Sequence, residues 1–279
     1  MAENYTEAVN VAREYYNSND ADNFYFNIWG GEDLHLGIYN TPDESIFDAS
    51  RRMVQRMASK VPKLDESTPV MDLGGGYGGS MRYLARTYGC PCTVLNLSEV
   101  ENERDRKMNK EQGLDHLMTV LDGDFANVPC DDESFSVVWS QDAILHSDDR
   151  RKVLSEAARV LVPGGTLVFT DPMQKDDAPT DKLQPIYDRI QLESLASPGF
   201  YEKTGKEMGL EFVEFENHEK QLPLHYGRVR EELINREDEL HENVSDEYIQ
   251  NMKKGLQHWV DGGNNGYLTW GVFVFRKPE

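Results

Sequence analysis

Residues 70–80 read VMDLGGGYGGS and join a short apolar run to a glycine-rich turn. Residues 70–73 have the length and content of a buried parallel strand, and glycines let the chain turn sharply with bare backbone against a ligand. Met81, Leu84 and Ala85 follow at helical spacing. The segment therefore predicts a strand, a cofactor-binding loop and a helix, in that order, although a glycine-rich turn alone also occurs in ordinary tight turns.

The spacing of the loop is Asp-x-Gly-x-Gly-x-Gly, from Asp72 through Gly74 and Gly76 to Gly78. Dinucleotide-binding loops normally have no acid two residues before the first glycine, and they hold a pyrophosphate at the helix N-terminus. An acid here suits a cofactor that carries a cation, and this argues against a dehydrogenase. The loop resembles the first motif of the seven-stranded, Rossmann-like methyltransferases. That resemblance implies S-adenosylmethionine as the cofactor.

Strand and helix patterns alternate downstream of this loop. Further apolar runs predict strands, and the segments between them predict helices: strands at 93–97, 117–121, 135–139, 166–170, 210–215 and 267–275, and helices at 99–112 and 151–160. Ser98 and Glu101 have capping-box spacing at the start of the first helix, and residues 163–165 predict a turn. The order predicts an α/β fold, and the resemblance implies a seven-stranded Rossmann-like sheet.

Several polar side chains follow the ends of these strands, where ligands bind in open α/β sheets. Asn96 stands where related methyltransferases usually carry an acid for the ribose hydroxyls. Asp124 suits the exocyclic amine of adenine, and Phe125 suits its stacking face. Gln141 follows the fourth strand. The predicted cofactor site comprises Asp72, Gly74, Gly76, Asn96, Leu97, Asp124, Phe125 and Gln141, together with Tyr25 and Trp29.

Length and composition indicate an enzyme with one main domain. The 279 residues are 38% hydrophobic, which suffices for one α/β core with insertions. No apolar run approaches the roughly 18 residues of a membrane helix, and the N-terminus lacks a secretory signal pattern. The three cysteines have no zinc-like spacing. We therefore expect a cytoplasmic protein with reduced thiols and no metal, either a monomer or a small homo-oligomer.

The charge balance is strongly acidic, with 50 Asp and Glu against 29 Lys and Arg and a formal net charge of −21. Such a surface repels nucleic-acid phosphates and anionic lipids, so neither a nucleic acid nor a membrane is an expected partner. Two interpretations of the charge remain open: adaptation to high salt, where screening relieves self-repulsion, or an ordinary acidic cytosolic protein.

Three segments lie outside the predicted cofactor-binding core. Residues 1–60 are predicted to form an N-terminal helical cap, and residues 61–279 a Rossmann-like domain. Insertions at about 174–209 and 218–265 are rich in Tyr, Trp, Arg and His. Because insertions at the carboxyl ends of strands commonly cover a ligand site, we expect these two to form a substrate lid.

Other motifs narrow the resemblance. They lie outside the generic fold signature and extend the match from about Ala12 to Lys277: residues 25–39, 96–106, 141–146, 170–174, 221–228 and 266–271. In these motifs the chain resembles the sarcosine and dimethylglycine N-methyltransferases, which make glycine betaine. The resemblance implies sarcosine and dimethylglycine as substrates. A phosphoethanolamine-type or other small-amine N-methyltransferase, and a noncatalytic S-adenosylmethionine-binding module, are the alternatives.

Methyl transfer to nitrogen requires a neutral amine, so the site needs a group that takes a proton. His146 follows a strand end, and imidazole titrates near neutral pH. A structural histidine is the plain alternative. Phosphoethanolamine methyltransferases carry a similar Asp-x-x-Leu-His segment whose His pairs with an N-terminal Tyr. This resemblance implies Asp142, His146 and Tyr16 as catalytic residues, with Tyr15 and Tyr25 as alternatives for the tyrosine.

The implied product carries a quaternary ammonium, which aromatic faces stabilise. Candidates are Tyr25, Trp29, Tyr201, Tyr226 and Trp270, of which Tyr25 and Tyr201 are preferred and Trp270 is expected to pack in the last strand. The carboxylate of the substrate calls for a planar guanidinium. The substrate-binding prediction therefore comprises Tyr201, Tyr226, Arg189 and, second among the arginines, Arg228, although an arginine paired with an acid is the usual case in so acidic a chain.

Overall fold

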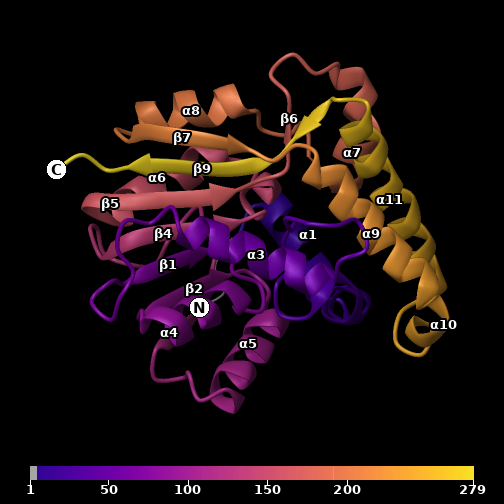
Figure 1. The fold of residues 1–279 in the computed structure, drawn as a ribbon, viewed down its shortest axis with the longest axis horizontal. Coiled ribbons are helices and arrows are strands. Elements are labelled where there is room, and N and C mark those ends of the chain that lie inside the picture. Colours follow the sequence, from indigo (N-terminus) through magenta and orange to yellow (C-terminus); the bar gives the residue numbers. More distant parts are fainter. Residues whose placement is uncertain (1–4, 191) are drawn as a thin grey trace.

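The computed structural model describes residues 5–190 and 192–279, so the first four residues of the predicted cap lie outside the described part. Within these residues, seven strands form one sheet in the order β3-β2-β1-β4-β5-β9-β7 (Figure 1). They are β1 (Val70–Leu73), β2 (Cys92–Asn96), β3 (Met118–Asp122), β4 (Phe135–Gln141), β5 (Leu161–Thr170), β7 (Glu211–Asn217) and β9 (Gly271–Arg276). From β3 to β5 the strands pair in parallel, and β9 runs antiparallel to both of its neighbours. The predicted seven-stranded α/β sheet is confirmed.

Two details of the sheet differ from the sequence prediction. The last predicted strand is interrupted at Trp270 into β8 (Leu268–Thr269) and β9, and β8 pairs with β6 (Met173–Gln174) in a separate two-stranded sheet. In addition, β5 begins before the predicted turn at 163–165, and its register to β4 shifts at that end. The apolar residues of the sequence showed where this strand lies. The Pro-Gly-Gly sequence at 163–165 predicted a turn, however, and did not show that the strand begins before it.

Helices cover both faces of the sheet. One face carries α3 (Ile46–Ala58), α4 (Gly79–Tyr88) and α5 (Glu99–Glu111), and the other carries α6 (Arg150–Val160) and α8 (Pro198–Glu207). Successive side chains of β1 point to opposite faces of the sheet. Val70 packs with apolar residues of α3 and α4 on one face, whereas Met71 and Leu73 pack with those of α6 on the other. Burial on both faces is what a central parallel strand requires.

The remaining helices gather beyond the carboxyl ends of β1, β4 and β5 (Figure 1). They are α1 (Glu7–Tyr16), α2 (Asn19–Phe24), the π-helical turn η1 (Tyr25–Gly30), the short 3-10 turn η2 (Ile144–His146), α7 (Thr180–Ile190), α9 (Gln221–Asn235), α10 (Glu237–Leu240) and α11 (Asp246–Asn264). The first predicted insertion is therefore divided, since α7 lies beyond the strand ends while α8 covers the sheet.

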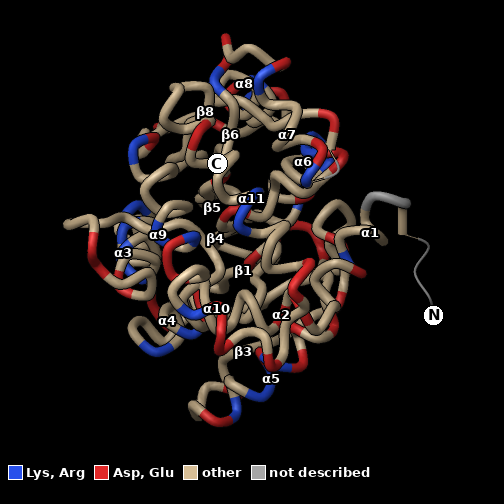
Figure 2. The backbone as a smooth tube through the Cα atoms, turned by 90° about the vertical axis from the view of Figure 1, so that its right-hand side faces the viewer, with Lys and Arg blue, Asp and Glu red and all other residues tan. Residues whose placement is uncertain are grey.

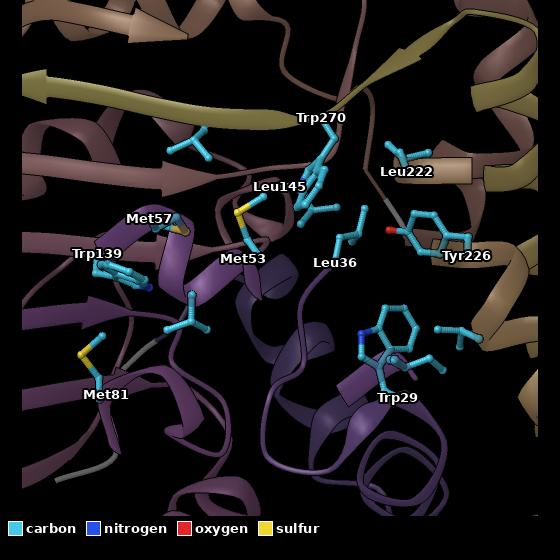
Figure 3. Packing of buried hydrophobic residues seen from close by; sticks show 14 of the residues in the cluster. Trp29, Leu36, Met53, Met57, Met81, Trp139, Leu145, Leu222, Tyr226 and Trp270 are labelled. Atoms are coloured by element: carbon cyan, nitrogen blue, oxygen red, sulfur yellow. The ribbon is translucent and has the colours of Figure 1, made fainter. Parts of the chain in front are cut away.

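One apolar cluster joins these end helices to the sheet (Figure 3). It runs from Met81 and Trp139 beside the sheet to Trp29 and Tyr226 among the end helices. Because the two regions share one core, the site between them has a rigid frame.

Acidic residues occur around the whole outline of the molecule in the view of Figure 2 and are not gathered on one face. Arg82 is a fully buried basic residue, and its guanidinium pairs with Asp105 at 2.6 Å and with Glu32 at 2.7 Å. None of the described helices is both long and apolar enough to span a bilayer.

Candidate active site

Two cavities lie at the carboxyl ends of the strands. The first, here the sheet cavity, is lined by the loop after β1, by the ends of β2 and β4, and by α1. The second, the helix cavity, is lined by α1, α7 and α11. They share a wall made of Ala12, Tyr16, Tyr25 and His146. The sheet cavity is lined by every predicted cofactor residue except Trp29.

The loop after β1 forms the floor of the sheet cavity. Gly74 has a φ of 81°, and a Cβ atom there would lie 2.5 Å from the Cβ of Ala143, so only glycine lets the loop approach the turn after β4. Asp72 is buried, and its Oδ1 has no hydrogen-bond partner among the described residues. Burial raises the pKa of Asp72 to about 8. This side chain suits a cationic group of a ligand.

Glu101 is a member of the site that the sequence prediction assigned only to a helix cap. Ser98 does cap α5, because its hydroxyl accepts a hydrogen bond from the Glu101 backbone N–H at 3.2 Å. The Glu101 side chain instead lines the sheet cavity, where Oε2 accepts from Asn96 Nδ2 at 2.8 Å. Burial raises the pKa of Glu101 to about 7. Glu101 thus brings a carboxylate to the part of the cavity where Asn96 stands in place of the usual acid.

The lining of the sheet cavity also includes Asp124, Phe125 and Gln141. Phe125 lies against the glycine loop, with its Cε1 placed 3.4 Å from where a Gly74 Cβ would be. Gln141 Oε1 accepts hydrogen bonds from Ser80 and from the Trp139 indole, at 2.6 and 2.9 Å. Its Nε2 is buried and makes no hydrogen bond within the described chain. These three side chains therefore offer the cavity a donor, a carboxylate and an aromatic face.

Asp142 is tied into the fold. Oδ2 accepts from the Leu36 backbone N–H at 2.6 Å, and Oδ1 accepts from the Thr170 hydroxyl and the Trp270 indole, each at 2.8 Å. Its φ is 53°, an uncommon conformation for a residue other than glycine. A carboxylate already accepting three bonds has little capacity left for a substrate. Asp142 is therefore placed to position the turn that carries His146.

Tyr16 and His146 meet in the shared wall, where the hydroxyl oxygen lies 2.9 Å from His146 Nε2. Burial raises the pKa of Tyr16, so its hydroxyl stays protonated and donates to Nε2 when the imidazole carries its proton on Nδ1. Burial, followed by the charges of Arg189 and Arg150, lowers the pKa of His146 to about 4, so the imidazole is neutral near pH 7. The alternatives for the tyrosine are engaged elsewhere: Tyr15 bonds Tyr248 at 2.9 Å and contacts Tyr25 at 3.4 Å.

Arg189 lines the helix cavity from the last turn of α7. Its Nη2 donates to the Met252 thioether at 3.0 Å, and within the described chain no carboxylate lies within ion-pair distance of it. Tyr248 and Met252 of α11 also line this cavity, and the sequence prediction missed both. Their four-residue spacing on one face of a predicted helix was the available signal.

Four predicted site residues line neither cavity. Tyr201 is fully buried under the other face of the sheet and donates to Asp171 at 2.6 Å. Arg228 pairs with Glu231, one turn along α9. Trp29 and Tyr226 pack together in the core (Figure 3), where Tyr226 stacks on Trp259 at 5.0 Å. The structure does not bring these side chains to the cavities: Tyr201 and Arg228 bond to acids elsewhere, and Trp29 and Tyr226 pack against other aromatic rings.

The sequence and fold match known proteins. Residues 71–169 match the family model described as a methyltransferase domain. The chain is 60% identical to a sarcosine/dimethylglycine N-methyltransferase of Halorhodospira halochloris, over 99% of this chain and 100% of the relative. A second protein of that description, from Aphanothece halophytica, is 52% identical over 96% of each chain. The chain belongs to the sarcosine/dimethylglycine N-methyltransferase family.

A solved structure agrees with this membership. A crystal structure described as a sarcosine dimethylglycine methyltransferase from Galdieria sulphuraria is 43% identical, with a TM-score of 0.90, covering 95% of this chain and 99% of the other. This member of the family is therefore an S-adenosylmethionine-dependent N-methyltransferase, which confirms the cofactor implied by the loop at 70–80 and the activity implied by the further motifs. The sheet cavity fits that cofactor, because unpartnered Asp72 Oδ1 suits an ammonium and unpartnered Gln141 Nε2 suits a carboxylate.

Proposed function

We propose that the protein methylates sarcosine to dimethylglycine and then dimethylglycine to glycine betaine. The single observation that carries this proposal is the position of Arg189. Its guanidinium faces a cavity lined by tyrosines and has no carboxylate partner in the described chain. A small amino acid bound there by its carboxylate would direct its nitrogen toward the wall shared with the sheet cavity. The names of the relatives from Halorhodospira halochloris and Aphanothece halophytica support the same substrates.

The cofactor roles follow from the contacts in the sheet cavity. Asp72 would pair with the ammonium of the methionine part, and Gln141 Nε2 would donate to its carboxylate. Glu101 and Asn96 would hold the ribose hydroxyls, and Phe125 with Asp124 the adenine. When bound, S-adenosylmethionine supplies an electrophilic methyl group on a sulfonium.

Tyr16 and His146 are placed to take the proton that the substrate amine loses before it attacks. The amine proton passes to the Tyr16 oxygen while the Tyr16 hydroxyl proton passes to His146 Nε2, so that the net transfer is one proton from the amine to the imidazole, and the nitrogen lone pair is freed. A substrate carboxylate on Arg189 offsets one of the two positive charges that depress the pKa of His146. Substrate binding would therefore make the imidazole a better base.

The phenol rings would stabilise the cationic product. Tyr15, Tyr16 and Tyr25 lie with ring centroids 5.0 to 6.5 Å apart, and all three line the helix cavity. Each cation-π contact to a quaternary ammonium contributes on the order of 0.5 to 2 kcal/mol. The rings also need no hydrogen from the ammonium, which betaine cannot give.

Glycine betaine is an osmolyte, and this role agrees with the acidic composition. We infer a cytoplasmic enzyme that works at high salt, as a monomer or a small homo-oligomer, with no nucleic-acid or membrane partner. The net charge of −21 supports the salt tolerance.

The test is a labelled-methyl assay with glycine, sarcosine, dimethylglycine and phosphoethanolamine. Transfer to sarcosine and dimethylglycine, with betaine as the end product, is expected. Transfer to phosphoethanolamine and to neither glycine derivative would contradict the proposal.

A further inference from the structure

We propose that Gly255 is a positioning residue for substrate recognition: the side chain that it lacks leaves the space in which the Arg189 guanidinium lies. The inference rests on the proposed function, in which Arg189 holds the carboxylate of the substrate. Both residues line the helix cavity.

Arg189 is not held by an ion pair within the described chain. Its side chain contacts α11, and its hydrogen bond to the Met252 thioether, at 3.0 Å, is to a weak acceptor. A long flexible side chain with so weak an anchor needs a shaped surface to fix its direction, because each lost rotamer costs free energy. That surface is α11.

Gly255 provides the shape. A Cβ atom at this position would lie 2.1 Å from Arg189 Nε and 2.3 Å from its Cδ, far inside the roughly 3.5 Å of an ordinary contact. Gly255 sits within the 19-residue helix α11, in a backbone conformation that alanine also adopts. Glycine in a helix interior is less favourable than alanine, so the helix by itself favours alanine here.

The neighbouring side chains complete the groove. Tyr248, Met252 and Gly255 follow at spacings of four and three residues, so they lie on one face of α11. Tyr248 bonds Tyr15 at 2.9 Å, which anchors this face to α1. The guanidinium thus lies against a thioether on one turn and bare backbone on the next. A side chain at position 255 would displace the Arg189 guanidinium from this groove.

The experiment compares Gly255→Ala with Gly227→Ala in steady-state kinetics with sarcosine and dimethylglycine. At Gly227, in the interior of α9, a Cβ would meet only Val260 Cγ2, at 3.9 Å, so this variant is a matched control. Gly255→Ala is expected to raise KM for both substrates roughly 10- to 100-fold, because small misplacements of binding groups cost such factors. The dissociation constant of S-adenosylhomocysteine and the KM of Gly227→Ala are expected to stay unchanged.

Arg189→Ala and the double variant Gly255→Ala/Arg189→Ala complete the test. If Gly255 acts through Arg189, these two variants have the same KM, and the double variant unfolds at the same or a higher temperature than Arg189→Ala, because truncating the arginine removes the clash and the helix favours alanine at 255. This comparison also covers the case in which Gly255→Ala alone folds poorly. An unchanged KM in Gly255→Ala with a raised KM in Arg189→Ala would overturn this inference alone. An unchanged KM in Arg189→Ala would overturn the assigned role of the arginine as well.

Discussion

At the scale of single residues, the pairing of Tyr16 with His146 carries the proposed proton transfer. Replacing His146 by Ala is expected to lower kcat roughly 10²- to 10⁴-fold, the usual size of a general-base contribution. The dissociation constant of S-adenosylhomocysteine should stay within about twofold, because the Nε2 atom is bonded to Tyr16. His116→Ala is the control, since His116 is exposed and lines neither cavity. Unchanged turnover in His146→Ala would remove the histidine from the mechanism.

The two predicted arginines allow a matched comparison. Arg189→Met is expected to raise KM for sarcosine and dimethylglycine roughly 10- to 100-fold, the effect of losing a charge-assisted pair of about 1.5 to 3 kcal/mol. Arg228→Met should leave KM unaltered, since Arg228 pairs with Glu231 and lines neither cavity. The reverse pattern in the two KM values would place the substrate carboxylate elsewhere.

Asp72 makes cofactor binding depend on pH. Burial raises its pKa to about 8, so the carboxyl is protonated at pH 6 and must release a proton before it pairs with an ammonium. Affinity for S-adenosylmethionine is therefore expected to increase as pH rises from 6 to 8, with proton release on binding at the lower pH. Calorimetry in two buffers of different ionisation enthalpy measures both quantities. Asp72→Asn should bind weakly and with a flatter profile, and an equally steep profile in this variant would assign the dependence to another group.

At the scale of elements, Asp142 joins three segments: the chain at Leu36, the end of β5 at Thr170 and the break between β8 and β9 at Trp270. In Asp142→Asn, the amide oxygen alone can accept a hydrogen bond. The amide NH₂ would then face another donor, either the Leu36 N–H or the Thr170 hydroxyl and Trp270 indole. Asp142→Asn is expected to lower the free energy of unfolding by about 1 to 3 kcal/mol and also to lower kcat, because the turn carrying His146 loses its support. Urea unfolding measures the first effect.

The control for this variant is Asp115→Asn at an exposed position, for which no change is expected. A variant at 142 as stable as the wild type but inactive would instead indicate a direct catalytic role for the carboxylate.

At the scale of the whole molecule, the net charge of −21 predicts the response to salt. Repulsion among unpaired acids weakens when ions screen it, so the unfolding temperature is expected to rise between about 0.1 and 2 M KCl. Activity should persist over the same range. A fall of both with salt would favour the alternative of an ordinary acidic protein.

Much of this molecule could be predicted from the sequence, because local patterns determine it. The glycine loop at 70–80 and the apolar runs after it predicted the sheet, and the residues that follow those strands do line the sheet cavity. Long-range pairing could not be predicted. Tyr201 lies under the other face of the sheet because α8 returns to cover it. Arg228 instead forms a local pair with Glu231, three residues along α9, and an arginine paired with an acid was allowed for from the sequence, although the partner was not named. Glu101 was assigned to a helix cap, since sequence spacing does not show which way a side chain turns.

The central claim concerns the geometry of two cavities that meet at Tyr16 and His146. A crystal structure with S-adenosylhomocysteine and dimethylglycine tests it most directly. The account predicts the cofactor product in the sheet cavity, the dimethylglycine carboxylate within hydrogen-bond distance of Arg189, and its nitrogen directed at the shared wall between the cofactor sulfur and the Tyr16 hydroxyl. A carboxylate bound to any other group, with Arg189 turned away, would contradict it.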